Sequence, residues 1–528
     1  MCKEKRKKSW HCVKFLAIVF AMSRFSTYAQ QARPACAGCH PNETEAYLAS
    51  SMGKSIGSPD NVPAGKVNDT QSGSLIRAEW RNGKLFHSLS EDGLSAEHEI
   101  RYQIGAGKVG HSYAALVGDF LLESPASYYR RYGWDVSPGF AGAELLDFNR
   151  VLTDRCLFCH SNFANFSQGR RLNDDDLTAI GCERCHGPTE EHLRHPSKTN
   201  IVNPAQLTVR ARDSVCEQCH LEGLARVLNP GKTLHDFKAG MNLETTLTIY
   251  VVKQAGEGVK AVSQEEQLAV SRCARESSGK LWCGSCHNPH RQIKNRTSEI
   301  KEICASCHPA LSPARHANAS ECVSCHMPRR APTDVAHAAL TDHRILTRPD
   351  ALPPRKFSAT QELQAWREPQ PDVQQRDLGL AYLEASANAG FQQLGALAGN
   401  LLRSLPASQQ NDDAAVVAAL GDLELSQGHL AQALRFFRRA CELEPSSGEL
   451  AMYLGISLKQ NADAEGAAGE LRRAIQLDPS LERAYLELSA IYAKDGKLSE
   501  ARDVLNGYLK WNPLSILVRL TRETLTVR

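Results

Sequence analysis

The pattern of hydrophobic and polar positions changes character along this chain. Near its first third, short runs of apolar and polar residues predict strands at Leu75–Trp80, Lys84–Leu89 and Glu97–Ile104. Asn82-Gly83 separates the first two runs and is typical of a type I′ hairpin turn. Asp92-Gly93 marks a second turn. We therefore expect a small β insertion at about residues 70–111.

The last third of the chain has a helical pattern with a fixed period. Pro445, Pro479 and Pro513 lie 34 residues apart, and each follows a pair of helix-like segments. Small residues between the large ones let paired helices approach closely. This pattern resembles tetratricopeptide repeats, an α-solenoid family. We expect a weaker copy at residues 373–406 and a capping segment at Leu514–Val527.

The repeat resemblance implies a role in binding. Such solenoids bind peptides or partner proteins in their concave face. A dimerising or merely spacing module is the alternative role. Cys441 falls on a helix within a repeat, where we expect it to act as a small buried hydrophobic residue.

The first 29 residues have the pattern of an export leader. Basic residues precede a short apolar run, Phe15–Met22, and Thr27-Tyr28-Ala29 offers small residues for a signal peptidase. We expect a cleaved signal peptide at residues 1–29 and a periplasmic or otherwise exported protein. An uncleaved anchor is the alternative, but eight apolar residues are too few to span a bilayer. No transmembrane span is expected in the mature chain.

The formal charge is nearly balanced, with 62 Lys and Arg against 59 Asp and Glu, or +3. This balance argues against a nucleic-acid binder with a large basic face. The predicted leader has a net charge of +6, from seven Lys or Arg and one Glu, which leaves the mature chain at −3. We therefore expect redox protein partners with a basic face, and association that weakens with salt.

Cysteine and histidine are the exceptional residues, with 18 Cys and 19 His in 528 residues. Fourteen Cys form seven C-x-x-C-H motifs, numbered 1 to 7 in chain order. The cysteine pairs are Cys36 and Cys39, Cys156 and Cys159, Cys182 and Cys185, Cys216 and Cys219, Cys283 and Cys286, Cys304 and Cys307, and Cys322 and Cys325. Zinc and thioredoxin-like pairs also use C-x-x-C, but neither requires a His directly after it. Cys273 has no assigned role.

Two thiols three residues apart can each bond one vinyl group of a haem, and the following His then lies under the iron. The motifs therefore predict seven covalently bound haems c, with their iron ligated by His40, His160, His186, His220, His287, His308 and His326. These histidines are separated by 120, 26, 34, 67, 21 and 18 residues. The shorter gaps cannot each hold a packed domain, so we expect the haems to share walls and form a path for electrons.

Each iron takes a sixth ligand or leaves that position open. The candidates outside the motifs are His87, His98, His111, His192, His195, His235, His290, His316, His337, His343 and Met52. We favour His192, His290, His316, His337 and His343 as ligands, and keep His111 and Met52 beside them. Bis-His ligation gives low-potential haems suited to electron transfer, Met raises the potential, and an open iron can bind a small substrate. A surface or propionate-bonding role is the alternative for a single His, and core filling is the alternative for Met52.

The segments around these motifs carry a family resemblance. They resemble multihaem cytochromes of the cytochrome c-554 and hydroxylamine-oxidoreductase type, in Cys36–His40 with Met52, Gly181–Pro188 with His192, Cys283–His290, and Cys322–Pro328 with His337 and His343. The resemblance covers residues 34–348 and implies a mostly helical haem-stacking fold with periplasmic electron transfer. It also implies that His192 and His290 ligate neighbouring haems. All seven motifs end in His, so the Lys-ligated catalytic haem of ammonia-forming nitrite reductases is absent.

We therefore expect a mainly α protein in three parts. A heptahaem cytochrome domain at 34–348 carries the β insertion, a Pro-rich linker follows at 349–372, and a tetratricopeptide-repeat domain occupies 373–528. The expected function is electron transfer between redox partners, with the repeats docking a partner protein. Two alternatives stay open. One is a reductase or oxidase of a small nitrogen or sulfur compound at an open-coordinate haem, and the other is a repeat scaffold for a periplasmic redox complex.

Overall fold

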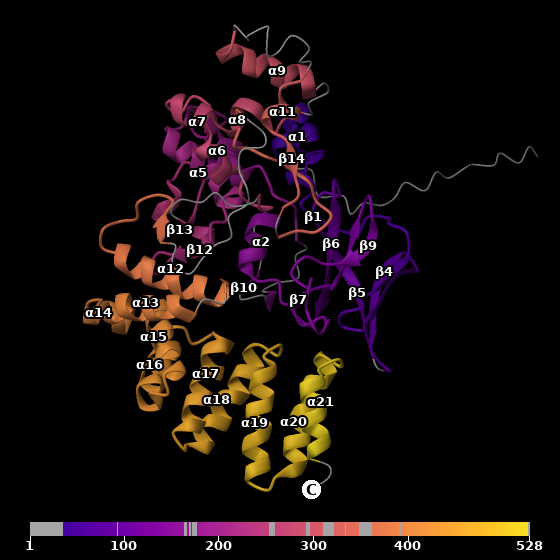
Figure 1. The fold of residues 1–528 in the computed structure, drawn as a ribbon, viewed down its shortest axis with the longest axis vertical. Coiled ribbons are helices and arrows are strands. Elements are labelled where there is room, and N and C mark those ends of the chain that lie inside the picture. The colour runs from indigo at the N-terminus through magenta and orange to yellow at the C-terminus, as the bar shows by residue number, and fades with distance from the viewer. Residues whose placement is uncertain are drawn as a thin grey trace, which may run out of the picture.

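The computed structural model describes residues 35–91, 93–162, 166–167, 170–171, 177–252, 259–291, 296–309, 321–332, 334–347, 362–389 and 392–525. The expected leader and His316 lie outside the described residues. Figure 1 shows a sheet-rich N-terminal region, a region of short helices that carries the cysteine motifs, and stacked helix pairs at the C-terminus. Across the described ranges, every helix is too short or too polar to cross a bilayer.

The N-terminal region is built on one antiparallel sheet. Its main path runs β10-β11-β7-β6-β5-β4-β3-β2, while β1 pairs with β5, and β8 pairs with β6 and β9. The strands are β1 Ile56–Gly57, β2 Gly65–Asn68, β3 Leu75–Arg81, β4 Lys84–Glu91, β5 Leu94–Ile104, β6 Gly110–Val117, β7 Phe120–Glu123, β8 Ala126–Tyr129, β9 Gly133–Val136, β10 Phe166–Ser167 and β11 Arg170–Arg171.

The predicted hairpin is confirmed, but the sheet is far larger than the small insertion expected at 70–111. Strands β3 and β4 pair from Leu75↔Ser90 to Arg81↔Lys84, and the turn residues Asn82 and Gly83 have φ values of +52° and +78°. Strand β7 is buried at all four positions, so it lacks the alternation that marks a half-buried strand. The expectation of a mainly α fold is therefore wrong for this region.

Short helices carry the cysteine motifs. The helical elements from the N-terminus to motif 4 are η1 Ala35–Gly38, α1 Pro41–Leu48, η2 Met52–Lys54, α2 Asp154–His160, α3 Glu183–His186, α4 Glu190–Arg194, η3 Pro204–Gln206 and α5 Val209–His220. Beyond motif 4 they are η4 Leu234–Asp236, η5 Leu243–Thr245, α6 Gln264–Val270, α7 Arg272–Glu276, α8 Cys283–Cys286, α9 Arg296–Cys307 and α11 Val323–His326. A two-stranded sheet, β14 Arg329–Arg330 and β15 Leu340–Thr341, follows motif 7.

A three-stranded sheet joins the motif region to the repeats. It has the order β12 Ala225–Leu228, β13 Leu247–Val252 and β16 Leu363–Ala365. Strand β16 lies inside the segment expected to be a linker at 349–372. Directly after it, Trp366 Nε1 donates a hydrogen bond of 2.8 Å to Glu217 Oε1 on α5. The described part of that segment is therefore a structural junction.

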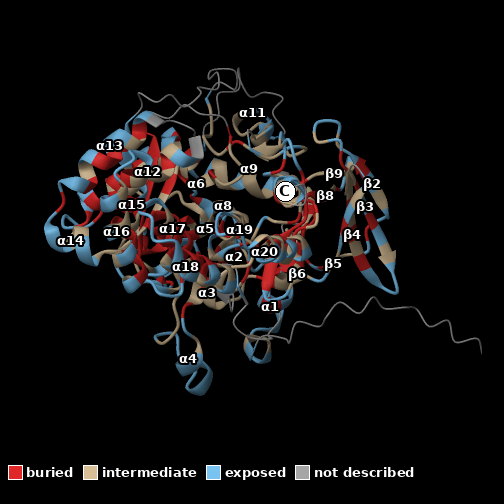
Figure 2. Cartoon of the chain, turned by 90° about the horizontal axis from the view of Figure 1, so that it is seen from below, coloured by how far each residue is buried: buried red, intermediate tan, exposed pale blue. Residues whose placement is uncertain are grey.

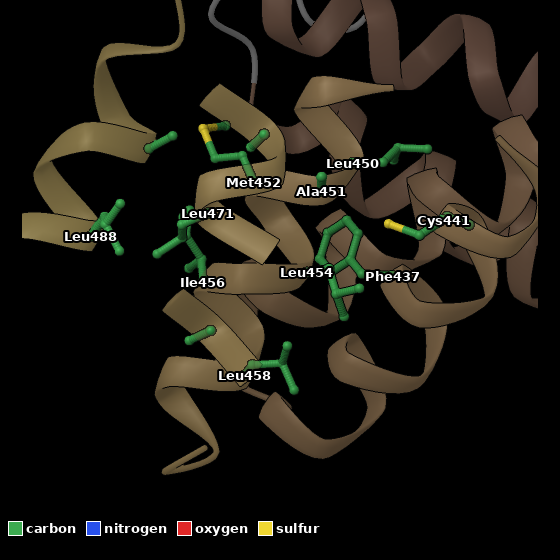
Figure 3. Packing of buried hydrophobic residues seen from close by; sticks show 14 of the residues in the cluster. Phe437, Cys441, Leu450, Ala451, Met452, Leu454, Ile456, Leu458, Leu471 and Leu488 are labelled. Atoms are coloured by element: carbon green, nitrogen blue, oxygen red, sulfur yellow. The ribbon is translucent and has the colours of Figure 1, made fainter. Parts of the chain in front are cut away.

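The repeats form the predicted stack of helix pairs. Its helices are α12 Gln374–Ala389, α13 Gln392–Arg403, α14 Ala407–Asp412, α15 Ala414–Ser426, α16 Leu430–Leu443, α17 Gly448–Gln460, α18 Ala464–Leu477, α19 Glu482–Lys494, α20 Leu498–Trp511 and α21 Ile516–Thr524. Figure 3 shows Phe437, Leu454 and Leu471 filling the space between pairs. Cys441 is buried in the same cluster, as expected for a small hydrophobic residue.

Both ends of the stack are attached to the rest of the protein. At the first end, Arg155 on α2 forms an ion pair of 2.6 Å with Glu384 on α12. At the other end, Asn512 Nδ2 donates 2.8 Å to Asp147 Oδ2, and Leu514 is buried in the core of the sheet region. Figure 1 shows the stack running from α12 below the motif helices to α21 below the sheet, and Figure 2 shows the same parts from below.

Replacing Asn149 by alanine should loosen the C-terminal attachment. Asn149 Nδ2 donates to Tyr508 Oη at 2.8 Å, and its Oδ1 accepts from Trp511 Nε1 at 2.9 Å. Losing both bonds costs about 2 kcal/mol, so local opening and amide hydrogen exchange in α21 should quicken about thirtyfold. The exposed Asn400→Ala on α13 is the matched control and should leave exchange nearly unchanged. Equal exchange in both variants would show that this contact does not hold the stack.

Candidate haem sites

Each motif places its two cysteines and its histidine on one side of a helical turn. The histidine amide donates to the carbonyl of the first cysteine, at 2.7 Å for His40, 2.9 Å for His186 and His287, and 3.0 Å for His308 and His326. The other two motifs lie within helices α2 and α5. Residues i, i+3 and i+4 of a helix share a face, so the thiols and the imidazole point the same way. Covalent haem attachment with a proximal imidazole needs this arrangement.

Two of these histidines are held by backbone carbonyls. His186 Nδ1 lies 2.7 Å from the carbonyl oxygen of Val202, and His326 Nδ1 lies 2.7 Å from that of Leu346. Because a carbonyl only accepts, Nδ1 carries the proton and Nε2 keeps its lone pair for a metal. The residues present therefore fit the ligation of a haem iron.

The motifs lie close together although they are far apart in sequence. In four pairs of thiols, one thiol lies near enough to shift the pKa of the other: Cys36 with Cys182, Cys159 with Cys219, Cys216 with Cys283, and Cys304 with Cys322. Two further pairs are close enough to interact electrostatically: Cys185 with Cys216, and Cys286 with Cys304. These contacts join the motifs in the order 1, 3, 4, 5, 6 and 7, with motif 2 attached to motif 4.

Three motif histidines each face a second imidazole. Ring centres are 6.5 Å apart for His40 and His192, 5.6 Å for His186 and His290, and 6.2 Å for His287 and His343, with interplanar angles of 19°, 30° and 30°. A metal lies about 2 Å from each imidazole nitrogen, so two rings on one iron have centres about 6 Å apart. The three pairs match that spacing.

The pairing follows a rule along the chain. The histidine that trails motif 3 faces motif 1, the one that trails motif 5 faces motif 3, and the one that trails motif 7 faces motif 5. His192 Nδ1 lies 3.0 Å from the Ser197 carbonyl oxygen, and His343 Nδ1 lies 2.8 Å from that of Thr341. Both rings therefore also present Nε2 to the facing imidazole.

The remaining candidate ligands are placed elsewhere. His111 lies in the sheet, with Nδ1 2.9 Å from the Gly105 carbonyl oxygen and Nε2 3.2 Å from Asp60 Oδ2. His337 Nε2 lies 2.5 Å from Asp135 Oδ2, and its ring packs between Tyr129 and Tyr132. Met52 begins the short turn η2. In the described ring contacts, neither His111 nor His337 faces a motif histidine.

Sequence analysis gave no priority to His235. His235 lies on η4, and its ring centre is 6.2 Å from that of Phe158, the residue before the second cysteine of motif 2. Burial lowers the pKa of His235. Burial also lowers the pKa of His160 and His220, although both side chains keep some exposed surface. A neutral imidazole is the form that ligates a metal. The signal for His235 is its position in space, which no motif marks.

Buried carboxylates lie near two of the motifs. Burial raises the pKa of Glu265 to about 7, and its Oε2 accepts from the Cys283 thiol at 3.3 Å. Burial likewise raises the pKa of Glu123 to about 7, although Arg150 Nη1 lies 3.0 Å from its Oε2. The lost hydration of each carboxylate outweighs the attraction of its neighbours.

Replacing Glu123 by glutamine should flatten the pH dependence of stability. The folded pKa lies above the unfolded value near 4.3, so the folded state binds more protons between these values. The Glu123 carboxyl therefore contributes to the free energy of unfolding at low pH. About 1 to 3 kcal/mol of this contribution is lost as the pH rises to 7. Denaturation at pH 4.5 and 7.5 measures the change. The exposed Glu97→Gln is the control, and an unchanged pH slope in Glu123→Gln would contradict the account.

Comparison with known proteins agrees with the two parts of the chain. A family model described as cytochrome c554 and c-prime matches residues 144–187, which include motifs 2 and 3. A tetratricopeptide-repeat model matches residues 414–447, which form α15 and α16. The curated multiheme cytochrome MtrA of Shewanella baltica (strain OS185) is 25% identical over 179 residues, or 29% of this chain and 52% of the relative.

The repeats have their own relatives. The human PEX5-related protein is 29% identical over 89 residues, 17% of this chain and 14% of that protein. A crystal structure of MamA covers 26% of this chain at 18% identity with a TM-score of 0.24. The first repeat domain of Spaghetti (RPAP3), bound to an HSP90 peptide, covers 22% at 18% identity with a TM-score of 0.21.

One part of the chain is therefore similar to multihaem cytochromes of the cytochrome c554 type, and another part is similar to tetratricopeptide repeats. Similarity to a cytochrome c family suggests covalently bound haem c and electron transfer, and similarity to the repeats suggests protein interaction. The chain spans about half the length of MtrA and about one seventh of the human repeat relative.

Proposed function

We propose that this chain is an exported heptahaem c-type cytochrome that transfers electrons between redox partners, with its repeats docking one of them. The observation that carries the proposal is the rule of facing imidazoles, in which the segment after one motif reaches back to the motif two places earlier. Such interleaving makes the sites mutually dependent. Independent zinc or disulfide sites do not need it.

The fourteen motif cysteines would hold seven haems by thioether bonds, and the seven motif histidines would ligate their iron. His192, His290 and His343 would complete the coordination of the first, third and fifth haem. The bound group supplies a one-electron iron couple. The chain itself orients the imidazoles through the Val202, Leu346, Ser197 and Thr341 carbonyls.

The contacts between motifs support a continuous path. Thiols of neighbouring motifs lie near enough for one to shift the pKa of the other, so the groups they attach would share walls rather than stand apart. Motifs 1, 2 and 7 end three arms of this path, and motif 4 lies where the arms meet. Closely spaced redox centres pass electrons from one to the next, which makes transfer the natural activity of this arrangement.

The proposed setting is the periplasm or the cell exterior. The basic start, the apolar run Phe15–Met22 and the small residues before Gln30 support a leader that ends at Ala29. Its removal leaves a chain at −3, before haem propionates add further negative charge. A partner with a basic face fits that balance, and its binding should weaken as salt rises.

A spectrum of the dithionite-reduced protein with and without carbon monoxide tests the electron-carrier role. Six-coordinate, low-spin haem throughout, with no spectral change on adding carbon monoxide, is the expected result. A high-spin fraction that binds carbon monoxide and turns over nitrite, hydroxylamine or sulfite would overturn the carrier role and favour an oxidoreductase.

A further inference from the structure

Three motifs meet through the residues that lie between their cysteines. Phe158 of motif 2, Arg184 of motif 3 and Gln218 of motif 4 are buried, with 2%, 6% and 3% of their surface exposed. Arg184 Nη2 donates 2.7 Å to Gln218 Oε1, and the guanidinium carbon of Arg184 lies 4.0 Å from the centre of the Phe158 ring. One arginine thus contacts both neighbouring motifs.

Backbone groups complete this junction. Gln218 Nε2 donates 3.1 Å back to the carbonyl oxygen of Arg184, so the two residues hold each other reciprocally. Arg184 Nη1 donates 3.1 Å to the carbonyl oxygen of Asn162, which follows motif 2. The side chain of Asn162 in turn accepts 3.0 Å from the amide of Gly181, directly before motif 3. These bonds fix the spacing of motifs 2, 3 and 4.

The junction also fixes a charge. A guanidinium stays protonated at every pH that proteins experience. Arg184 therefore places a permanent positive charge in a buried region between three haem attachment points. Positive charge favours the reduced form of a nearby one-electron couple, and it acts strongly where water is excluded.

We propose that Arg184 positions motifs 2, 3 and 4 and raises the reduction potentials of the three haems that they bind. This inference rests on the proposed heptahaem function. It also identifies the haems along the path that hold electrons most favourably. Motif 4 is the point at which motif 2 leaves the path. Electrons that enter along any of the arms would reside mainly on the haems of motifs 2, 3 and 4 before they are passed on.

Arg184→Gln tests the charge, with Arg184→Lys as the variant that keeps it. A spectropotentiometric titration of the full-length holoprotein should show three haems whose reduction constants fall about tenfold in Arg184→Gln, or about 59 mV for a one-electron couple. The reduction potentials of the other four haems should be unchanged. In Arg184→Lys, all seven potentials should stay near their wild-type values. Arg155→Gln is the matched control beside motif 2, because that arginine is 57% exposed and paired with Glu384.

Gln218→Glu tests the same charge without removing the arginine. The new carboxylate would face the guanidinium and neutralise it, so the same three potentials should fall even if Arg184→Gln does not accumulate. Unchanged potentials in the variants that retain seven haems, or a shift spread evenly over all seven, would overturn the role of Arg184. Fewer than seven haems in the wild-type protein would instead refute the proposed function.

Discussion

A chain with both cysteines of motif 3 replaced, Cys182→Ala with Cys185→Ala, should lose more than one haem. Cys182 of motif 3 lies near Cys36 of motif 1, and Cys185 lies near Cys216 of motif 4. Its trailing His192 faces His40. Removing the haem of motif 3 would therefore leave its neighbours without a wall and would displace a ligand of motif 1. We expect intact-mass spectra with five or fewer haems and poor accumulation of the chain.

The control for this loss is replacement of the two cysteines outside the motifs. Cys441 is buried among repeat residues, and Cys273 lies on α7. A Cys273→Ala, Cys441→Ala variant should keep seven haems, at a stability cost of about 1 kcal/mol for the cavity left in the repeats. If the motif 3 variant keeps six haems and a normal yield, the sites are independent and the account of shared walls is wrong.

Replacing His290 by alanine should open one iron and leave the others unchanged. The His290 ring faces His186 with ring centres 5.6 Å apart, and His290 lies directly after Pro289, which restrains the turn after motif 5. Without that ring, the third haem should become high-spin and bind carbon monoxide. About one seventh of the haem absorbance should respond. His290→Met should restore the low-spin state and raise one potential, on the order of 0.1 V.

His337→Ala is the contrasting variant. His337 follows motif 7 and was as good a candidate as His343 from the sequence, but its Nε2 lies 2.5 Å from Asp135 Oδ2. Its removal should leave the spin state of every haem unchanged. A high-spin signal from His337→Ala, or none from His290→Ala, would contradict the assignment of facing imidazoles.

The features that the sequence predicts well are local. A haem attachment motif is five residues long, and its geometry is one helical turn, so no distant residue is needed to recognise it. The repeats are recognised because Pro445, Pro479 and Pro513 keep a fixed period. The hairpin at Asn82-Gly83 is recognised because both residues suit a positive φ.

The features that the sequence missed depend on tertiary contacts. The structure places His111 beside Asp60 and His337 beside Asp135, which is 202 residues away, and no sequence pattern indicates either contact. Strand β7 shows no alternation of apolar and polar residues, because both of its faces are buried. The attachment of the C-terminal end of the repeats depends on Asn149 and Asn512, which carry no signal in the sequence.

The central claim is that seven haems occupy one chain in mutually supporting sites. Intact-mass spectrometry of the protein exported from its native host counts covalent haems directly and also gives the position of the mature N-terminus. We predict a chain that begins at Gln30 and carries seven haems. A mass with fewer haems in a fully folded, homogeneous sample, or unmodified motif cysteines, would contradict the account.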